Sequence, residues 1–82
     1  MSGHLRYFCD DGRHLICLPY TRPNLHKMAL DLGISRCWFH ASPRHPHYDI
    51  PKRQIERIKQ DPRVTVISPR EILLLIKKAQ EV

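Results

Sequence analysis

The chain has little glycine, and it has no long apolar run. Only three glycines occur among its 82 residues, so it contains no glycine-rich loop of the kind that cradles phosphate groups. The longest apolar run, Ile72–Ile76, is far shorter than the roughly 18 residues that a membrane-spanning helix needs. Met1–Arg6 is short and polar, which predicts that no signal peptide is present. We therefore expect a cytoplasmic protein that does not associate with membranes.

Cysteine is also scarce, and its spacing excludes the common metal and redox motifs. The three cysteines are Cys9, Cys17 and Cys37, and no pair has the C-x-x-C spacing of a zinc or disulfide-exchange site. Each lies in an apolar run that is typical of a strand, so we expect buried free thiols and a reducing compartment. The chain also lacks a nucleophile elbow and a helical H-E-x-x-H motif.

Basic residues outnumber acidic ones. The chain has 14 Lys and Arg against eight Asp and Glu, which gives a formal net charge of +6. Such a balance favours an anionic partner, either an anionic ligand or nucleic acid, although a solvated basic surface fits it equally well. The length allows one domain, residues 1–82, with a small core. A ligand or a homodimer contact would add to the stability of such a core.

Local patterns predict seven elements in alternation. Apolar and β-branched runs predict strands at residues 5–9, 14–18, 34–39 and 64–67. Capping signals and helical periodicity predict helices that end before Gly33, at residue 60 and near residue 79. The fold class that follows is α/β: a small single-domain sandwich with a mixed, partly parallel sheet of three to four strands and three helices.

The last helix begins with a capping box, in which Ser68 is the N-cap and Glu71 the N3 residue. Its apolar run, Ile72–Ile76, is wider than one helical stripe. Either the helix is buried on two sides or it supports a homodimer. We favour burial, because a small core needs the area.

Residues 38–53 hold half of the six histidines, three of the seven prolines and the only tryptophan. Pro43 and Pro46 exclude regular structure from residues 41–47. Polar side chains that follow strands in alternating α/β folds gather at the carboxyl ends of those strands. The candidate catalytic residues on this basis are Asp10, Asp11, His40, His47 and Asp49. Asp49 also suits the N-cap of the second helix.

Two kinds of ligand fit this segment. His45 and His47 form an H-x-H pair and are the first candidates for a divalent metal, which we do not favour because such pairs occur often by chance. Lys52 and Arg53 lie at a helix N-terminus and, with Arg44 from the preceding loop, are candidates for binding phosphate. The cofactor stays unknown at this point.

The chain resembles a group of small bacterial and phage proteins catalogued as domain of unknown function 4031. The likeness spans about residues 5–71, and its most specific part is the segment W-F-H followed by H-Y-D-I. The residues that carry it are Tyr7, Phe8, Cys9, Asp10, Asp11, His14, Leu15, Leu25, His26, Met28, Ala29, Leu32, Gly33, Ile34, Trp38, Phe39, His40, His47, Tyr48, Asp49, Ile50, Lys52 and Arg53. The resemblance implies a compact cytoplasmic domain and supplies no reaction. Its marked polar positions fall here on Asp10, Asp11, His14, His40, His47, Tyr48, Asp49 and Arg53.

Two functions remain open. The first is a module that binds, or acts on, a phosphate-bearing ligand, a nucleotide or nucleic acid; hydrolysis or phosphoryl transfer with His47 as acid and base is the reaction class to test. The second is a non-catalytic interaction module, such as a phage-type inhibitor of a host partner, that docks through the basic second helix. The first predicts that the imidazoles and carboxylates converge in a cavity, and the second predicts that they are dispersed.

Overall fold

The computed structural model describes residues 5–81. The prediction about a signal peptide rests on residues 1–6, and residues 1–4 lie outside the described range. The strands and helices follow one another along the chain in the order ββα, ββ, αβα, with a short 3₁₀ turn, η1, after the first helix. Their bounds are β1 Arg6–Cys9, β2 His14–Leu18, α1 Arg22–Leu32, η1 Arg36–Trp38, β3 Phe39–His40, β4 His47–Asp49, α2 Lys52–Gln60, β5 Val64–Val66 and α3 Pro69–Gln80.

The strands form one mixed sheet in the order β3-β4-β2-β1-β5. β1 and β5 run parallel, and the other neighbouring pairs are antiparallel. The α/β class, the mixed sheet and the three helices are confirmed. The sheet has five strands rather than three to four, because residues 47–49, which we expected in a loop and a helix cap, form β4.

The region around β3 departs from the predicted strand at residues 34–39. The Ser35 side chain accepts a hydrogen bond from the backbone N–H of Cys37, and this local bond begins η1. Only Phe39 and His40 pair with the sheet. The two prolines of the following loop do interrupt pairing, as expected, and the chain rejoins the sheet at His47. The chain rejoins the sheet there because the next residue, Tyr48, places its side chain in the core, where it is completely buried.

Asp49 does not cap α2, so that prediction is wrong. The N-cap position is Pro51, and no side-chain bond caps this helix in the described part of the chain. Asp49 lies two residues earlier, at the end of β4. Its carboxylate is therefore available to other groups.

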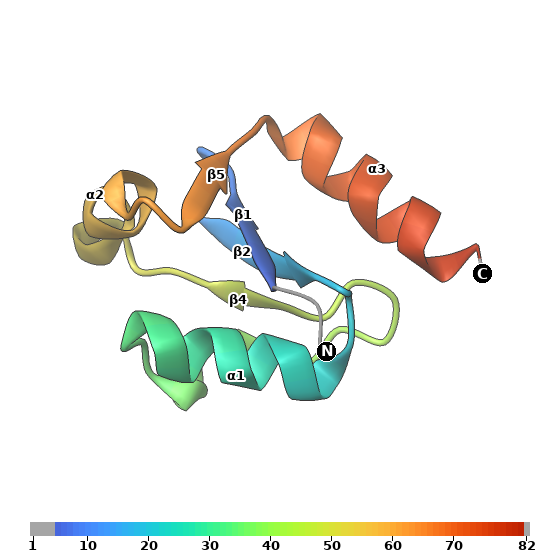
Figure 1. Cartoon of the computed structure of the whole chain (residues 1–82), viewed down its shortest axis with the longest axis horizontal. Helices are drawn as coiled ribbons and strands as arrows, with labels where there is room; N and C mark the ends of the chain where they lie inside the picture. The colour runs from blue at the N-terminus through green and yellow to red at the C-terminus, as the bar shows by residue number, and fades with distance from the viewer. Residues whose placement is uncertain (1–4, 82) are drawn as a thin grey trace.

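The helices cover the two faces of the sheet unequally. α1 lies along one face and α3 lies on the opposite side, while α2 lies beyond the sheet at one end of the molecule (Figure 1). α1 buries the predicted apolar stripe of Leu25, Met28, Ala29 and Leu32. α3 buries only Ile72 and Ile76. None of the helices within residues 5–81 is long and apolar enough to cross a membrane.

Two-sided burial of α3 is wrong, because a single stripe faces the sheet. Leu73 and Leu74 are 54% and 56% exposed, whereas Ile72 and Ile76 are buried. The homodimer through this helix stays a prediction.

The burial of each cysteine depends on the element in which it lies. Cys9 and Cys17, on the two central strands, are buried as expected, whereas Cys37 is exposed because it lies in η1 and not in a strand. Burial raises the pKa of Cys9 to about 11 and that of Cys17 to about 12. Both buried thiols therefore stay protonated and unreactive at neutral pH.

Candidate functional site

β4 directs alternate side chains to opposite faces of the sheet. His47 and Asp49 lie on one face and Tyr48 on the other, because successive residues of a strand alternate. His47 is paired in register with His40 of β3, and Asp49 with His14 of β2. Side chains of paired residues share a face. Three adjacent strands thus bring three imidazoles and one carboxylate together on the face that α3 covers.

The side-chain distances within this group are short. His47 Nε2 lies 3.0 Å from Asp49 Oδ1, and His40 Nδ1 lies 3.8 Å from Asp49 Oδ2. The ring of His47 lies with its centroid 5.0 Å from the centroid of His14 and 5.0 Å from that of His40. Asp49 is therefore shared between two histidines, and His47 contacts both of the others.

A buried carboxylate fixes the ring of His14. Asp10 is completely buried, and its Oδ1 accepts a hydrogen bond of 2.9 Å from the backbone N–H of His14. Its Oδ2 lies 3.0 Å from His14 Nδ1. An ionised carboxylate only accepts hydrogen bonds, so Nδ1 of His14 is the protonated nitrogen and Nε2 carries the lone pair.

The tight turn between β1 and β2 makes this contact. The backbone N–H of Arg13 donates to the carbonyl of Asp10 over 3.1 Å, and Arg13 adopts the left-handed region with φ of 67°. This is the usual conformation of the last residue in a three-residue hairpin loop. Gly12 leaves room for the His14 ring, since a Cβ atom there would lie 3.0 Å from two ring atoms.

Side chains from outside the loop hold residues 41–46 in place through hydrogen bonds to the loop's backbone carbonyls. His47 Nδ1 donates to the carbonyl of His45 over 2.6 Å, and the Tyr20 hydroxyl donates to the carbonyl of Pro46 over 2.7 Å. The Gln80 side chain, near the end of α3, donates to the carbonyl of Arg44. The first contact fixes the tautomer of His47: Nδ1 carries the hydrogen, and Nε2 faces Asp49.

The polar group opens into a cavity of about 310 Å³ between the sheet and α3. The sheet and the loop supply its polar wall, and α3 supplies an apolar one. The lining residues are Asp10, His14, His40, Ser42, His45, His47, Pro69, Ile72, Leu73 and Ile76. The volume is at the lower end of the range of about 300–1,000 Å³ for ligand pockets.

The structure brings together four of the five candidate catalytic residues, namely Asp10, His40, His47 and Asp49. The fifth, Asp11, is exposed and pairs with Lys59 Nζ at 3.1 Å, outside the cavity lining.

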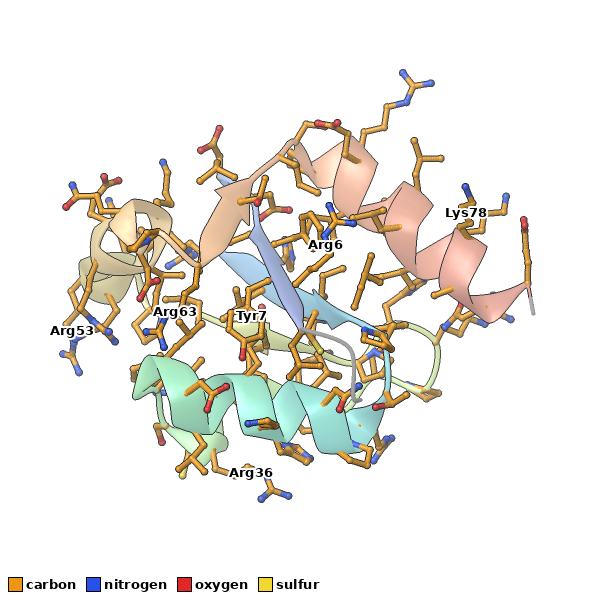
Figure 2. All side chains as sticks on the ribbon, in the orientation of Figure 1. Arg6, Tyr7, Arg36, Arg53, Arg63 and Lys78 are labelled. Carbon is orange, nitrogen blue, oxygen red and sulfur yellow. The ribbon has the colours of Figure 1, made fainter. Side chains whose placement is uncertain are left out.

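The three candidate phosphate residues are not brought together. Arg44 belongs to the loop beside the cavity, whereas Lys52 lines a different hollow. Arg53 projects from α2 at the end of the molecule opposite Lys78 of α3 (Figure 2). Their role in phosphate binding stays a prediction.

His14 was not among the candidate catalytic residues predicted from the carboxyl ends of the strands. It begins β2 instead of ending a strand, and only its position four residues after Asp10, across a tight turn, signals the contact. His45 was grouped with His47 as a metal candidate. It is one of the residues that line the cavity, but the group of three potential ligands in the described residues is His14, His47 and Asp49.

Comparison with known proteins gives a family but no activity. The chain shows no significant similarity to a curated protein or to a solved structure. One family model matches residues 13–78, which include His14, His40, His47 and Asp49 and leave out Asp10 and Asp11. The chain therefore belongs to the family described as protein of unknown function DUF4031.

Proposed function

We propose that the domain binds a phosphate-bearing ligand, a nucleotide or a phosphate group of nucleic acid, in the cavity under α3. The observation that carries this proposal is the convergence of the imidazoles of His14, His40 and His47 on one cavity, which His45 also lines. Imidazole N–H groups donate hydrogen bonds to phosphate oxygens. His40 can supply such a donor, whereas the Nδ1–H groups of His14 and His47 are already donated to Asp10 and to the carbonyl of His45. Convergence of this kind was expected of a ligand-binding module and not of a docking module.

The charge and the shape of the cavity support the same proposal. The net charge of +6 raises the local concentration of anions around the chain. The Ser42 hydroxyl adds a further polar group to the cavity lining, and Ile72 and Ile76 add an apolar wall. A nucleotide combines a phosphate with a less polar body, which suits a lining divided in this way.

The basic surface of α2 is partly used within the fold, which weakens the docking alternative. Arg57 donates to the carbonyl of Leu32 over 3.1 Å and to Gln54. Lys59 pairs with Asp11 and Glu56. The two ion pairs offset the charge of Lys59, and the hydrogen bonds of Arg57 hold its guanidinium against the fold.

The test is a thermal-shift screen against pyrophosphate, ADP and short single-stranded DNA. Each ligand is screened with a chelator and, separately, with one equivalent of Zn²⁺. A ligand present at 100 times its Kd stabilises the fold by roughly 2.7 kcal/mol, which is several degrees for a domain of this size. We expect a shift with at least one phosphate-bearing ligand.

His40→Ala is the informative variant, because the His40 side chain is 58% exposed and lines the cavity. We expect it to fold and to lose most of the shift, whereas Arg53→Glu, far from the cavity, should keep it. Failure of every ligand in both conditions would contradict the proposal. So would a shift that Arg53→Glu abolishes and His40→Ala preserves, which would place binding on α2.

A further inference from the structure

We infer that His14, His47 and Asp49 form a binding site for a divalent transition-metal ion, with Zn²⁺ the first candidate. Each of these side chains offers one ligand atom, and the three atoms lie within 4.8 Å of one another. Two imidazole nitrogens and a carboxylate oxygen are a donor set that zinc and non-haem iron use. His14 and His47 line the cavity of the proposed function, and Asp49 lies beside His47. The inference rests on that function only for the ligand that would complete the coordination.

The hydrogen bond between Asp10 and His14 matches the outer-shell hydrogen bond that orients a metal-binding histidine. A histidine that binds a metal almost always donates its other ring N–H to a carboxylate or a carbonyl, which fixes the tautomer and increases the basicity of the ligating nitrogen. His14 donates through Nδ1 to Asp10, 3.0 Å away. Because Asp10 is completely buried, it holds the ring in place and leaves Nε2 as the nitrogen for a metal.

His47 repeats the arrangement with a backbone acceptor. Its Nδ1 donates to the carbonyl of His45 over 2.6 Å, so that Nε2 carries the lone pair. Both histidines therefore have the same tautomer, and each has its own outer partner on a different segment of the chain. An arbitrary pair of surface histidines has no reason to share this pattern.

The lone pair of His47 Nε2 faces another acceptor. Asp49 Oδ1 lies 3.0 Å away, and two acceptors at this distance repel unless a proton or a metal cation lies beside them. A metal about 2.0–2.1 Å from both atoms would have a ligand–metal–ligand angle of about 90–95° across that distance. Because Asp49 is 54% exposed, its carboxylate has the freedom to adjust the angle.

A shared proton would satisfy His47 and Asp49 alone. It would leave unexplained why the ring of His14, fixed by its own buried carboxylate, lies with its centroid 5.0 Å from that of His47. A metal uses all three groups. It would also leave at least one coordination position open, and a phosphate oxygen or a water molecule fits that position in a three-ligand site.

The experiment is a Zn²⁺ titration in competition with a chromophoric chelator, with no phosphate present. The background is Cys37→Ser, because the exposed Cys37 thiol is a separate zinc ligand. We expect one equivalent of bound Zn²⁺. We expect His47→Ala and Asp49→Ala each to weaken binding by more than about 100-fold, and Asp10→Asn to weaken it by about 10–100-fold, as outer-partner changes do.

His45→Ala is the matched control. It removes the imidazole of a residue that lines the same cavity but keeps the backbone carbonyl that orients His47, so we expect its affinity to stay within about threefold of the parent. Circular dichroism checks the fold of each variant. Asp49→Ala carries the argument if the others unfold, because this side chain is half exposed.

The inference is overturned if the parent protein does not compete for Zn²⁺, if Asp49→Ala keeps full affinity, or if His45→Ala loses as much as His47→Ala. Because the titration contains no phosphate, its failure says nothing against ligand binding. A phosphate-dependent thermal shift that persists in chelator would then keep the proposed function and remove only the metal.

Discussion

The two faces of the sheet hold the same kinds of polar side chain in opposite arrangements. Under α1, each buried tyrosine hydroxyl is paired with a side chain of the helix: the Tyr7 hydroxyl donates to Asp31 over 2.6 Å, and the Tyr48 hydroxyl lies 2.8 Å from His26 Nδ1. Under α3, Asp49 is shared by His40 and His47 beside a cavity. Closed pairs stabilise the fold, whereas shared and accessible groups are available to a ligand.

The packing of the two helices explains the difference. α1 buries four side chains against the sheet and α3 buries two. α3 leaves a cavity of about 310 Å³ between itself and the sheet. A helix that contributes fewer apolar side chains thus leaves more space against the sheet.

The electrostatics of the α1 face agree with a structural role. Burial, reinforced by the hydrogen bond to Asp31, raises the pKa of Tyr7 to about 12. Burial and the nearby Arg36 and Arg22 lower the pKa of His26. Both groups are therefore neutral at neutral pH.

The most damaging single change should be Tyr48→Ala on the α1 face. Its side chain is completely buried, and removal of a buried aromatic ring costs about 3–5 kcal/mol. That is a large part of the stability of a domain this small, at about 0.05–0.15 kcal/mol per residue. Urea denaturation measures the loss. A cost below about 1 kcal/mol would contradict the view that this face carries the fold.

A smaller loss is expected from Asp61→Asn, at the end of the α1-face network. Arg63 joins the carbonyl of Asp31 to Asp61, and its hydrogen bonds lower the pKa of Asp61 from 3.8 to about 2. We expect a loss of about 1–2 kcal/mol at neutral pH.

The pH dependence has a definite sign. Because the pKa of Asp61 is lower in the folded state, its contribution is fully present above pH 3.8 and is lost as the pH falls through about 2. The difference in unfolding free energy between wild type and Asp61→Asn should therefore shrink below pH 3.8. A difference that is constant from pH 7 to 2 would show that the carboxylate charge is irrelevant.

On the α3 face, Gly12→Ala should change binding more than stability. The new Cβ would lie 3.0 Å from two atoms of the His14 ring and 3.3 Å from Asp10 Oδ1, so the ring must move by a few tenths of an ångström. We expect unfolding free energy to change by less than about 1 kcal/mol and Zn²⁺ affinity to fall measurably. Unchanged affinity would mean that the position of the His14 ring does not matter.

The smallest effect is expected from Leu74→Lys on the outer side of α3. The residue is 56% exposed and lies outside the cavity lining, so stability should change by less than about 0.5 kcal/mol. Ligand and Zn²⁺ binding should be unchanged. Analytical ultracentrifugation of the two proteins tests the predicted homodimer, because a charge in such an interface should favour the monomer.

Local signals predicted most of the scaffold. The Leu25–Leu32 stripe of α1, the capping box at Ser68 and the strand that becomes β5 depend on residues close together in the chain, and the structure has them all. One failure was local, because the hydrogen bond between Ser35 and Cys37 begins η1 where a strand was expected. β4 was not predicted because its pairing with Leu15, 33 positions before Tyr48, leaves no local signal, and its proline-rich flank is typical of a loop.

The grouping of the candidate side chains was predicted in part, while their function stays a prediction. Asp10, His40, His47 and Asp49 were identified by their places near strand ends, and the sheet brings them together. The part played by His14 needed the geometry of a turn. The H-x-H pair by itself did not favour a metal site. The hydrogen bonds that His14 donates to Asp10 and His47 donates to the carbonyl of His45 do favour one, and these bonds are visible only in the structure.

The most direct test of the contrast between the faces is an NMR titration that follows the imidazole nitrogens as Zn²⁺ is added. His26 on the α1 face serves as the internal reference, because its Nδ1 is already paired with Tyr48. The account predicts that one equivalent of Zn²⁺ shifts the Nε2 resonances of His14 and His47 and leaves His26 unchanged. Unshifted His14 and His47, or a shift of His26 as large as theirs, would contradict it.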